Sequence, residues 1–193
     1  MSSAFPYHLF ETPLGWIGIA WSERGLSRVQ LPERDRAATE RRLLATLPRA
    51  QAAHPAEQSA EQLPAAIAEA VAAIRRYAAG ETVDFTDIAV DLGDADDFRL
   101  AIYDAARGLG FGETVTYGEL AARAGHAGLA RETGQALGQN PVPIVVPCHR
   151  ILAAGGKIGG FSAPGGSVTK ERLLNLEGVQ VGPPPSAQGS FVF

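Results

Sequence analysis

The chain of 193 residues has a single cysteine, Cys148, and only four histidines. One cysteine cannot form an intramolecular disulfide, so a disulfide-stapled fold and a CxxC redox pair are both excluded. The histidines, His8, His54, His126 and His149, are scattered and have no cysteine pairs beside them. We therefore expect no structural zinc site and no bound metal.

Long apolar runs and basic tracts are also missing. No run is long enough to cross a membrane, and the first residues lack the basic and apolar regions of a signal peptide. Together with a thiol that must stay reduced, these absences favour a cytoplasmic protein. The net charge of −4 counts against a large nucleic-acid-binding surface, because Lys and Arg make the phosphate contacts. Neither a Walker-type loop nor a dinucleotide fingerprint is present, and we expect no cofactor.

Apolar residues make up 46% of the chain, enough for a core, and the length suits one large or two small domains. Three segments rich in β-forming residues predict an antiparallel meander: 7–12, 16–21 and 25–31. A polar helix is predicted from Pro32 to Leu47, followed by a loop over 48–55. A second helix is predicted over about 59–79, and one more strand over 83–90.

An acidic connector, residues 91–97, is the predicted domain boundary. Asp94 or Asp96 can cap the next helix, over about 97–109, where acidic side chains also suit the helix dipole. The predicted divisions are an amino-terminal domain, a carboxy-terminal domain and a loose tail: 1–92, 93–180 and 181–193.

Two short helices joined by a glycine-containing turn follow. Thr116 and Glu119 have the spacing of a capping box for the first helix, which ends at Gly125. The second helix is predicted over about 129–139. Such a pair is a helix-turn-helix pattern, although helical pairs are also common in proteins that never bind DNA.

The stretch Asn140-Pro-Val-Pro-Ile-Val-Val-Pro-Cys148-His149-Arg150 contains the only thiol. Its apolar run predicts a strand that three prolines stiffen. A thiol reacts as thiolate, and a free pKa near ~8.5 leaves few thiols ionised at neutral pH unless cations lower it. A lone cysteine is more often a small buried hydrophobe. Pro-Cys-His-Arg after such a run favours a nucleophile instead.

After the cysteine, residues 151–161 predict a hairpin or wing around a glycine turn. Ser167 is the predicted cap of a last helix, over 168–177, which Gly178 ends.

The stretch from Asn140 to Arg150 resembles the active-site signature of the O6-alkylguanine-DNA alkyltransferases, also called methylated-DNA–protein-cysteine methyltransferases. The resemblance covers residues 94–178 with specific motifs and residues 1–90 in outline. It implies an α/β (α+β) fold: a small amino-terminal RNase H-like domain and a carboxy-terminal, winged helix-turn-helix-like domain with the cysteine. It also implies direct-reversal repair, in which a methyl or larger alkyl group passes irreversibly from guanine O6 in double-stranded DNA to Cys148. Thymine O4 is left open as a second donor, and we expect a monomer.

The same resemblance implies roles for residues around the thiol. His149 would act as a base through a water molecule, oriented by Glu177 on the last helix. Tyr117 would rotate a phosphate and donate a proton to guanine N3. Without the resemblance, Glu177 would be interpreted as a solvated carboxylate and Tyr117 as a packed aromatic at a helix start.

Arg131 matches the arginine that takes the place of the flipped nucleotide, although a phosphate contact would explain it too. Asn140 matches a hinge residue, and Asn before Pro is also a common helix end. Arg150 is expected to be buried against a carboxylate or carbonyl, from where it could lower the pKa of Cys148. The residues expected to line the base pocket are Val142, Pro143, Ile158, Gly159, Phe161 and Ser162. Phe161 stands where many relatives have a tyrosine.

Three other functions compete with alkyl transfer. A module that binds alkylated bases and flags them for another repair pathway would share the fold, but Cys148 argues against it. A transcriptional regulator would need a dimer interface or a sensor domain, and the sequence indicates neither. A thiol hydrolase would need an oxyanion hole and repeated turnover.

Overall fold

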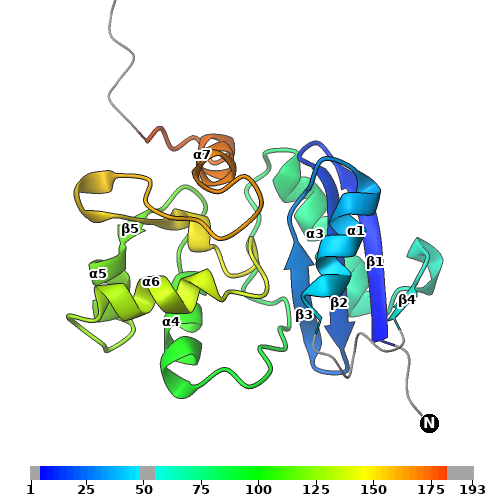
Figure 1. The fold of residues 1–193 in the computed structure, drawn as a ribbon, viewed down its shortest axis with the longest axis horizontal. Coiled ribbons are helices and arrows are strands. Elements are labelled where there is room, and N and C mark those ends of the chain that lie inside the picture. Colours follow the sequence, from blue (N-terminus) through cyan, green and yellow to red (C-terminus); the bar gives the residue numbers. More distant parts are fainter. Residues whose placement is uncertain (1–4, 48–54, 182–193) are drawn as a thin grey trace, which may run out of the picture.

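A computed structural model describes residues 5–47 and 55–181 of the chain (Figure 1). Most of the loop expected over 48–55 and nearly all of the expected tail lie outside the described residues. The amino-terminal half contains a four-stranded sheet, and the carboxy-terminal half is made mainly of short helices. The expected α/β class is therefore confirmed. None of the helices within the described ranges is long and apolar enough to cross a membrane.

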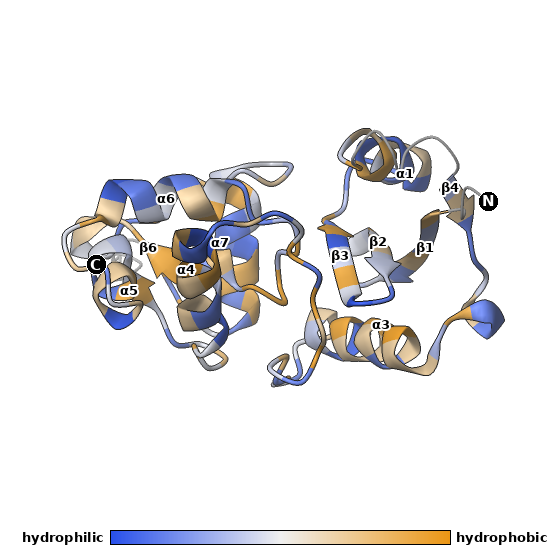
Figure 2. Ribbon diagram, turned by 90° about the horizontal axis from the view of Figure 1, so that it is seen from below, coloured by the Kyte–Doolittle hydropathy of each residue, from blue (hydrophilic) through white to orange (hydrophobic). Residues whose placement is uncertain are grey.

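The predicted meander forms the sheet. Strands β1 (Phe5–Thr12), β2 (Gly15–Ser22) and β3 (Gly25–Gln30) pair antiparallel, and β4 (Pro55–Glu57), which was not predicted, adds parallel to β1. The order is β3-β2-β1-β4. Consecutive residues of β2 are buried, which is expected when both faces of a sheet are covered. Helix α1 (Arg36–Ala45) covers one face and α3 (Ala65–Ala78) the other (Figure 2).

Both amino-terminal helices are shorter than predicted. Helix α1 starts after Asp35, whose carboxylate accepts a hydrogen bond from the amide of Ala38 at 2.7 Å. The single helix expected over 59–79 is wrong. Pro64 has no N–H and holds the preceding residue extended, so a 3₁₀ turn (Ala60–Gln62) is separated from α3.

The strand expected over 83–90 is also wrong, because only Val90 makes a bridge, to Leu26. The guanidinium of Arg107 gathers three of the segment's carbonyls at 2.8–3.0 Å, those of Phe85, Thr86 and Ile88. In an extended strand, successive backbone carbonyls point in opposite directions, so three carbonyls that converge on one cation are incompatible with a strand. The segment therefore runs as turns.

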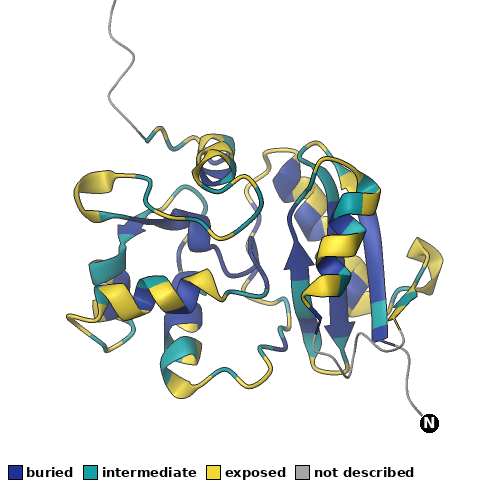
Figure 3. Cartoon of the chain, in the orientation of Figure 1, coloured by how far each residue is buried: buried dark blue, intermediate teal, exposed yellow. Residues whose placement is uncertain are grey.

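The carboxy-terminal helices agree better with the sequence. Asp96 caps α4 (Asp97–Arg107), and Thr116 forms the expected capping box with Glu119 at the start of α5 (Tyr117–Arg123). Helix α6 (Ala130–Gly138) packs on α4 and α5, its inner side buried and its outer side exposed (Figure 3). Helix α7 (Ser167–Leu176) starts at Ser167, which is not its cap as expected. Gly166 takes that place with φ +54°, a conformation that favours glycine.

The expected wing is smaller than predicted. Strand β6 (Ile151–Leu152) pairs parallel with β5 (Val115–Thr116), so the chain directly after the thiol is attached to the helix-turn-helix pair. A single antiparallel bridge then joins Ala153 to Lys157 around a 3₁₀ turn (Ala154–Gly156). The expected glycine turn is confirmed, with two glycines in the left-handed region.

The two halves meet along the edge of β3. The amide of Val29 donates to the carbonyl of Pro141 at 2.9 Å, and Leu26 exchanges backbone hydrogen bonds with the Ala89–Asp91 segment. One cluster of buried apolar side chains extends from the sheet, at Phe10, to the last helix, at Leu173. The chain that leads to Cys148 is thus held against the amino-terminal sheet.

Candidate active site

Cys148 is the first residue of a 3₁₀ turn, Cys148–Arg150, and the strand predicted to carry it is wrong. The run from Pro141 to Pro147 folds into tight turns in which the amide of Val146 donates to the carbonyl of Val142 at 2.9 Å. Ile144 has φ +75°, which is unfavourable for a β-branched residue and stores about 1–3 kcal/mol of strain. In this turn the side chains of Cys148, His149 and Arg150 do not alternate between two opposite faces, as they would in a strand.

Asn140 ties this loop together. Its Oδ1 accepts from the amide of Val142 at 3.0 Å, and its Nδ2 donates to the carbonyl of Val146 at 2.8 Å. The same Nδ2 lies 3.2 Å from the sulfur of Cys148. One side chain therefore fixes the loop and supplies a hydrogen-bond donor to the thiol.

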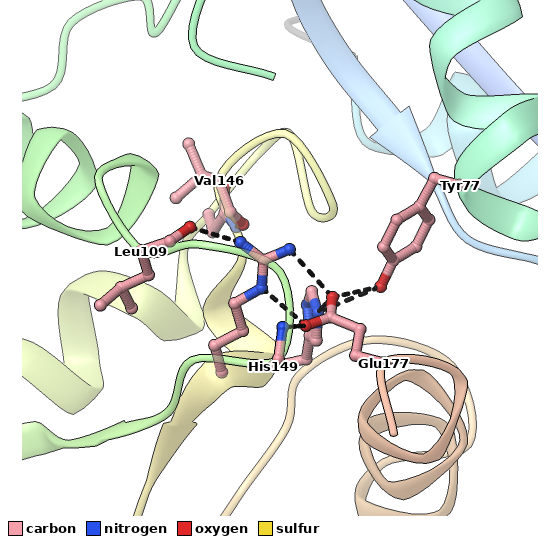
Figure 4. A network of polar contacts seen from close by, with 8 residues as sticks. Tyr77, Leu109, Val146, His149 and Glu177 are labelled. Carbon is pink, nitrogen blue, oxygen red and sulfur yellow. Dashed lines mark hydrogen bonds and ion pairs between the residues drawn. The ribbon is translucent and has the colours of Figure 1, made fainter. Parts of the chain in front are cut away.

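The carboxylate of Glu177, at the end of α7, is buried among donors (Figure 4). Oε1 accepts from Nε2 of His149 at 2.7 Å and from the hydroxyl of Tyr77 at 2.8 Å. Arg150 approaches both oxygens through Nε at 2.9 Å and Nη2 at 3.0 Å, and the amide of Gly112 donates to Oε2 at 2.8 Å. Five donors satisfy one carboxylate, so the charge is stable without water.

These contacts set the protonation of the pair. Burial would raise the pKa of Glu177, but the hydrogen bonds from His149 and Arg150 outweigh it and lower the pKa to about 2. Burial lowers the pKa of His149, against the opposing effect of Glu177. A neutral imidazole that donates from Nε2 to a carboxylate has its lone pair on Nδ1. That atom is buried and has no hydrogen-bond partner among the described residues.

Burial raises the pKa of the Cys148 thiol, although the hydrogen bond from Asn140 and the charge of Lys170 act to lower it. Lys170 is fully buried on α7, where Nζ donates to the carbonyls of Ile151 and Gly160. Burial lowers the pKa of Lys170 to about 8. The cation that acts to lower the pKa of the thiol is Lys170. Arg150 instead donates hydrogen bonds to Glu177 and to the carbonyl of Leu109.

A cavity of about 430 Å³ is lined in part by Cys148. Tyr117 and Gly134 form part of one wall, and the ring of Tyr117 packs beneath the glycine, where a Cβ would lie 3.7 Å from Cε1. Phe161 and Ser162 also line the cavity, as expected. Its volume falls within the range of small-molecule sites, about 300–1,000 Å³.

Only some of the other residues expected at the site border a cavity at Cys148. Pro143 borders a second cavity at Cys148, whereas Val142 is fully buried and borders neither. Ile158 and Gly159 also border neither, but Gly159 packs against the ring of Tyr117. Arg131 is exposed in the first turn of α6.

Two residues in the site, Lys170 and Tyr77, were not predicted. Lys170 precedes Leu173 and Leu174 at helical spacing, so the sequence did contain a signal that this charge faces inward. Tyr77 gave no comparable signal, because its spacing on α3 is that of an ordinary core residue. Its hydroxyl reaches Glu177 across 100 residues of sequence, which only the packing of the two halves brings about.

Comparison with known proteins gives this geometry a context. The model of the 6-O-methylguanine DNA methyltransferase DNA binding domain matches residues 97–179, and that of the ribonuclease-like domain matches residues 6–92. The methylated-DNA–protein-cysteine methyltransferase of Mycolicibacterium paratuberculosis is 35% identical over 171 residues, which cover 89% of this chain and 91% of the relative. This chain belongs to the 6-O-methylguanine DNA methyltransferase family.

Other relatives also match over most of their length. The methylated-DNA–protein-cysteine methyltransferase of Mus musculus is 34% identical over 181 residues, 93% of this chain and 84% of the relative. Among solved structures, Mycobacterium tuberculosis OGT in complex with DNA matches with a TM-score of 0.70 and 32% identity. That match covers 90% of this chain and 93% of the other. The family expected from the Cys148 motif is therefore confirmed.

Proposed function

We propose that this protein repairs double-stranded DNA by direct reversal, moving a methyl or larger alkyl group from guanine O6 to Cys148. The observation that supports this most is the position of the thiol. It lies at the edge of a cavity of suitable size, is hydrogen-bonded by Asn140, and sits in the same turn as His149, whose ring is hydrogen-bonded to Glu177. Membership of the family supplies the reaction class. O4-alkylthymine is a second possible donor.

The target base must first leave the duplex, at a cost of a few kcal/mol. Helix α6 presents small residues to the cavity, Gly134 and Gly138, which allow a close approach to a groove. The exposed Arg131, in the first turn of the same helix, occupies the space that the flipped nucleotide leaves. The flipped guanine stacks on Phe161, and Ser162 lies within the same wall.

The transfer itself needs a thiolate. The proton of Cys148 passes through one bridging water to Nδ1 of His149, and the resulting imidazolium is stabilised by Glu177. Sulfur attacks the alkyl carbon, so a C–S bond forms as the C–O6 bond breaks and its electron pair leaves with guanine. Tyr117 donates a proton to N3 of the departing base. The thioether is stable, so each molecule reacts once.

The remaining roles are structural. Arg150 holds Glu177 in place and lies away from the base, while Asn140 holds the loop and the sulfur. No step requires a cofactor. Because the thiol must stay reduced, we place the protein in the cytoplasm.

Mass spectrometry tests this function. The protein is incubated with duplexes containing O6-methylguanine or unmodified guanine and then digested. We expect the Cys148 peptide to gain the mass of one methylene with the first duplex only, and transfer to stop at one group per molecule. Cys148→Ser and Cys148→Ala should bind the lesion without any gain. Binding of the lesion by the unaltered protein with no gain would identify a recognition module instead.

A further inference from the structure

Cys148 borders a second cavity, distinct from the one that accepts the base. It has a volume of about 180 Å³. The two cavities share Gly138, Phe161 and Ser162 as well as Cys148. Tyr117 and Gly134 line only the base cavity, whereas residues of the amino-terminal half line only the second. Cys148 therefore borders both cavities.

The second cavity has a wall with two positive charges and no negative one. Arg28 on β3 and Arg42 on α1 both line it, and no Asp or Glu does. Neither guanidinium makes a hydrogen bond or ion pair with another described residue, unlike Arg24, which binds Asp91 at 2.8 Å. Arg28 is half-buried and Arg42 is exposed. Burial lowers the pKa of Arg28, against an opposing effect of Tyr103.

The geometry of the transfer reaction brings the far end of a longer alkyl group toward the second cavity. In a displacement at carbon, sulfur, carbon and the leaving oxygen lie in one line, and the other substituents of that carbon project sideways. A methyl group has only hydrogens there. A longer alkyl group has a chain that must leave this line, and the second cavity, which Cys148 also borders, offers space for it.

We propose that the Arg28–Arg42 wall binds the far end of alkyl groups that carry a negative charge, such as a carboxylate. This rests on the proposed function. Guanidinium groups bind carboxylates through paired, charge-assisted hydrogen bonds. A half-buried cation without a partner gains most from such a ligand, because the field around it is less screened by water. The amino-terminal half would thereby select among lesions that the carboxy-terminal half repairs.

The experiment compares lesions that differ in charge alone. Duplexes carry O6-methylguanine, or O6-alkylguanine with one to three methylenes ending in a carboxylate or in the isosteric carboxamide. Transfer to Cys148 is timed by mass spectrometry for the unaltered protein, Arg28→Gln and Arg42→Gln. Arg41→Gln is the matched control, because Arg41 lies on the same helix, is exposed and does not line the cavity.

We expect the unaltered protein to prefer the carboxylate over the carboxamide by about tenfold or more for at least one chain length. Arg28→Gln and Arg42→Gln should each reduce this ratio and leave the methyl rate unchanged, while Arg41→Gln should leave both as they were. A ratio near one in the unaltered protein would overturn the proposal while methyl transfer still proceeds. Equal slowing of all lesions by the two variants would instead assign the arginines to DNA phosphates. Absence of methyl transfer would overturn the proposed function itself.

Discussion

Nδ2 of Asn140 lies 3.2 Å from the sulfur of Cys148 and 2.8 Å from the carbonyl oxygen of Val146, so one amide group serves the loop and the thiol together. Burial raises the pKa of this thiol, and the hydrogen bond from the Asn140 amide is the largest of the effects that lower it. The reactivity of the sulfur should therefore depend on a residue that takes no part in the chemistry.

Asn140→Ala tests this dependence. A hydrogen bond to an ionised group is worth about 1.5–3 kcal/mol, so alkylation of Cys148 by iodoacetamide at neutral pH should slow by about tenfold or more. The rate is measured against pH, where the midpoint should move upward. Asn175→Ala, an exposed asparagine on α7, is the control. Superimposable pH profiles for the unaltered protein and Asn140→Ala would contradict the prediction.

Tyr77→Phe removes a donor to Glu177 and keeps the ring, which packs edge-on against Phe85 and Phe111. We expect a loss of about 1.5–3 kcal/mol in the free energy of unfolding and slower methyl transfer, because His149 and Glu177 are held less firmly. Urea denaturation and single-turnover kinetics measure the two effects.

Tyr103→Phe provides the comparison for that variant. The side chain of Tyr103 is as buried as that of Tyr77, but its hydroxyl donates to the carbonyl of Ala136 and not to Glu177. The Tyr103→Phe variant should lose stability, with little change in transfer rate once the folded fraction is taken into account. If both tyrosine variants slow transfer equally, the hydroxyl of Tyr77 has no special role.

Glu177→Gln should expose the acid dependence of stability. The pKa of Glu177 is about 2 in the folded protein against 4.5 for a free side chain, so its contribution is complete above pH 4.5 and is lost as pH falls toward 2. The loss is about 3 kcal/mol at ~1.4 kcal/mol per pH unit. At pH 7 the variant should be about 3–5 kcal/mol less stable, because Arg150 is left buried without its partner. The difference from the unaltered protein, measured by urea denaturation, should shrink between pH 4.5 and 2; a constant difference would refute the assignment.

Lys170→Met tests the opposite pH range. The pKa of Lys170 is about 8 in the folded protein and 10.5 when free, so the unfolded chain binds more protons between these values. The unaltered protein should therefore gain stability relative to Lys170→Met as pH rises from 8 to 10.5. Removing the cation should also raise the pKa of Cys148 and slow its alkylation at neutral pH. A stability difference that does not vary with pH would show that Lys170 titrates normally.

The elements that the sequence predicts well are those whose signals are local. The capping box of Thr116 and Glu119, the cap at Asp96 and the glycine turn after β6 each depend on residues a few positions apart. The predictions that are wrong depended on distant partners. The segment over 83–90 has the composition of a strand, but Arg107 bends it, and the apolar run before Cys148 turns because Asn140 ties it back.

The sequence by itself determined the family and pointed to Cys148 as the nucleophile that we propose, because the motif around Cys148 is contiguous. Only the tertiary structure decided how the thiol is surrounded. Packing of α3 and α7 brings Tyr77 and Lys170 to the site, and β3 places Arg28 in the wall of the second cavity that Cys148 borders. The physical reason is that burial and charge at one atom are sums over neighbours in space, and those neighbours are far apart along the chain.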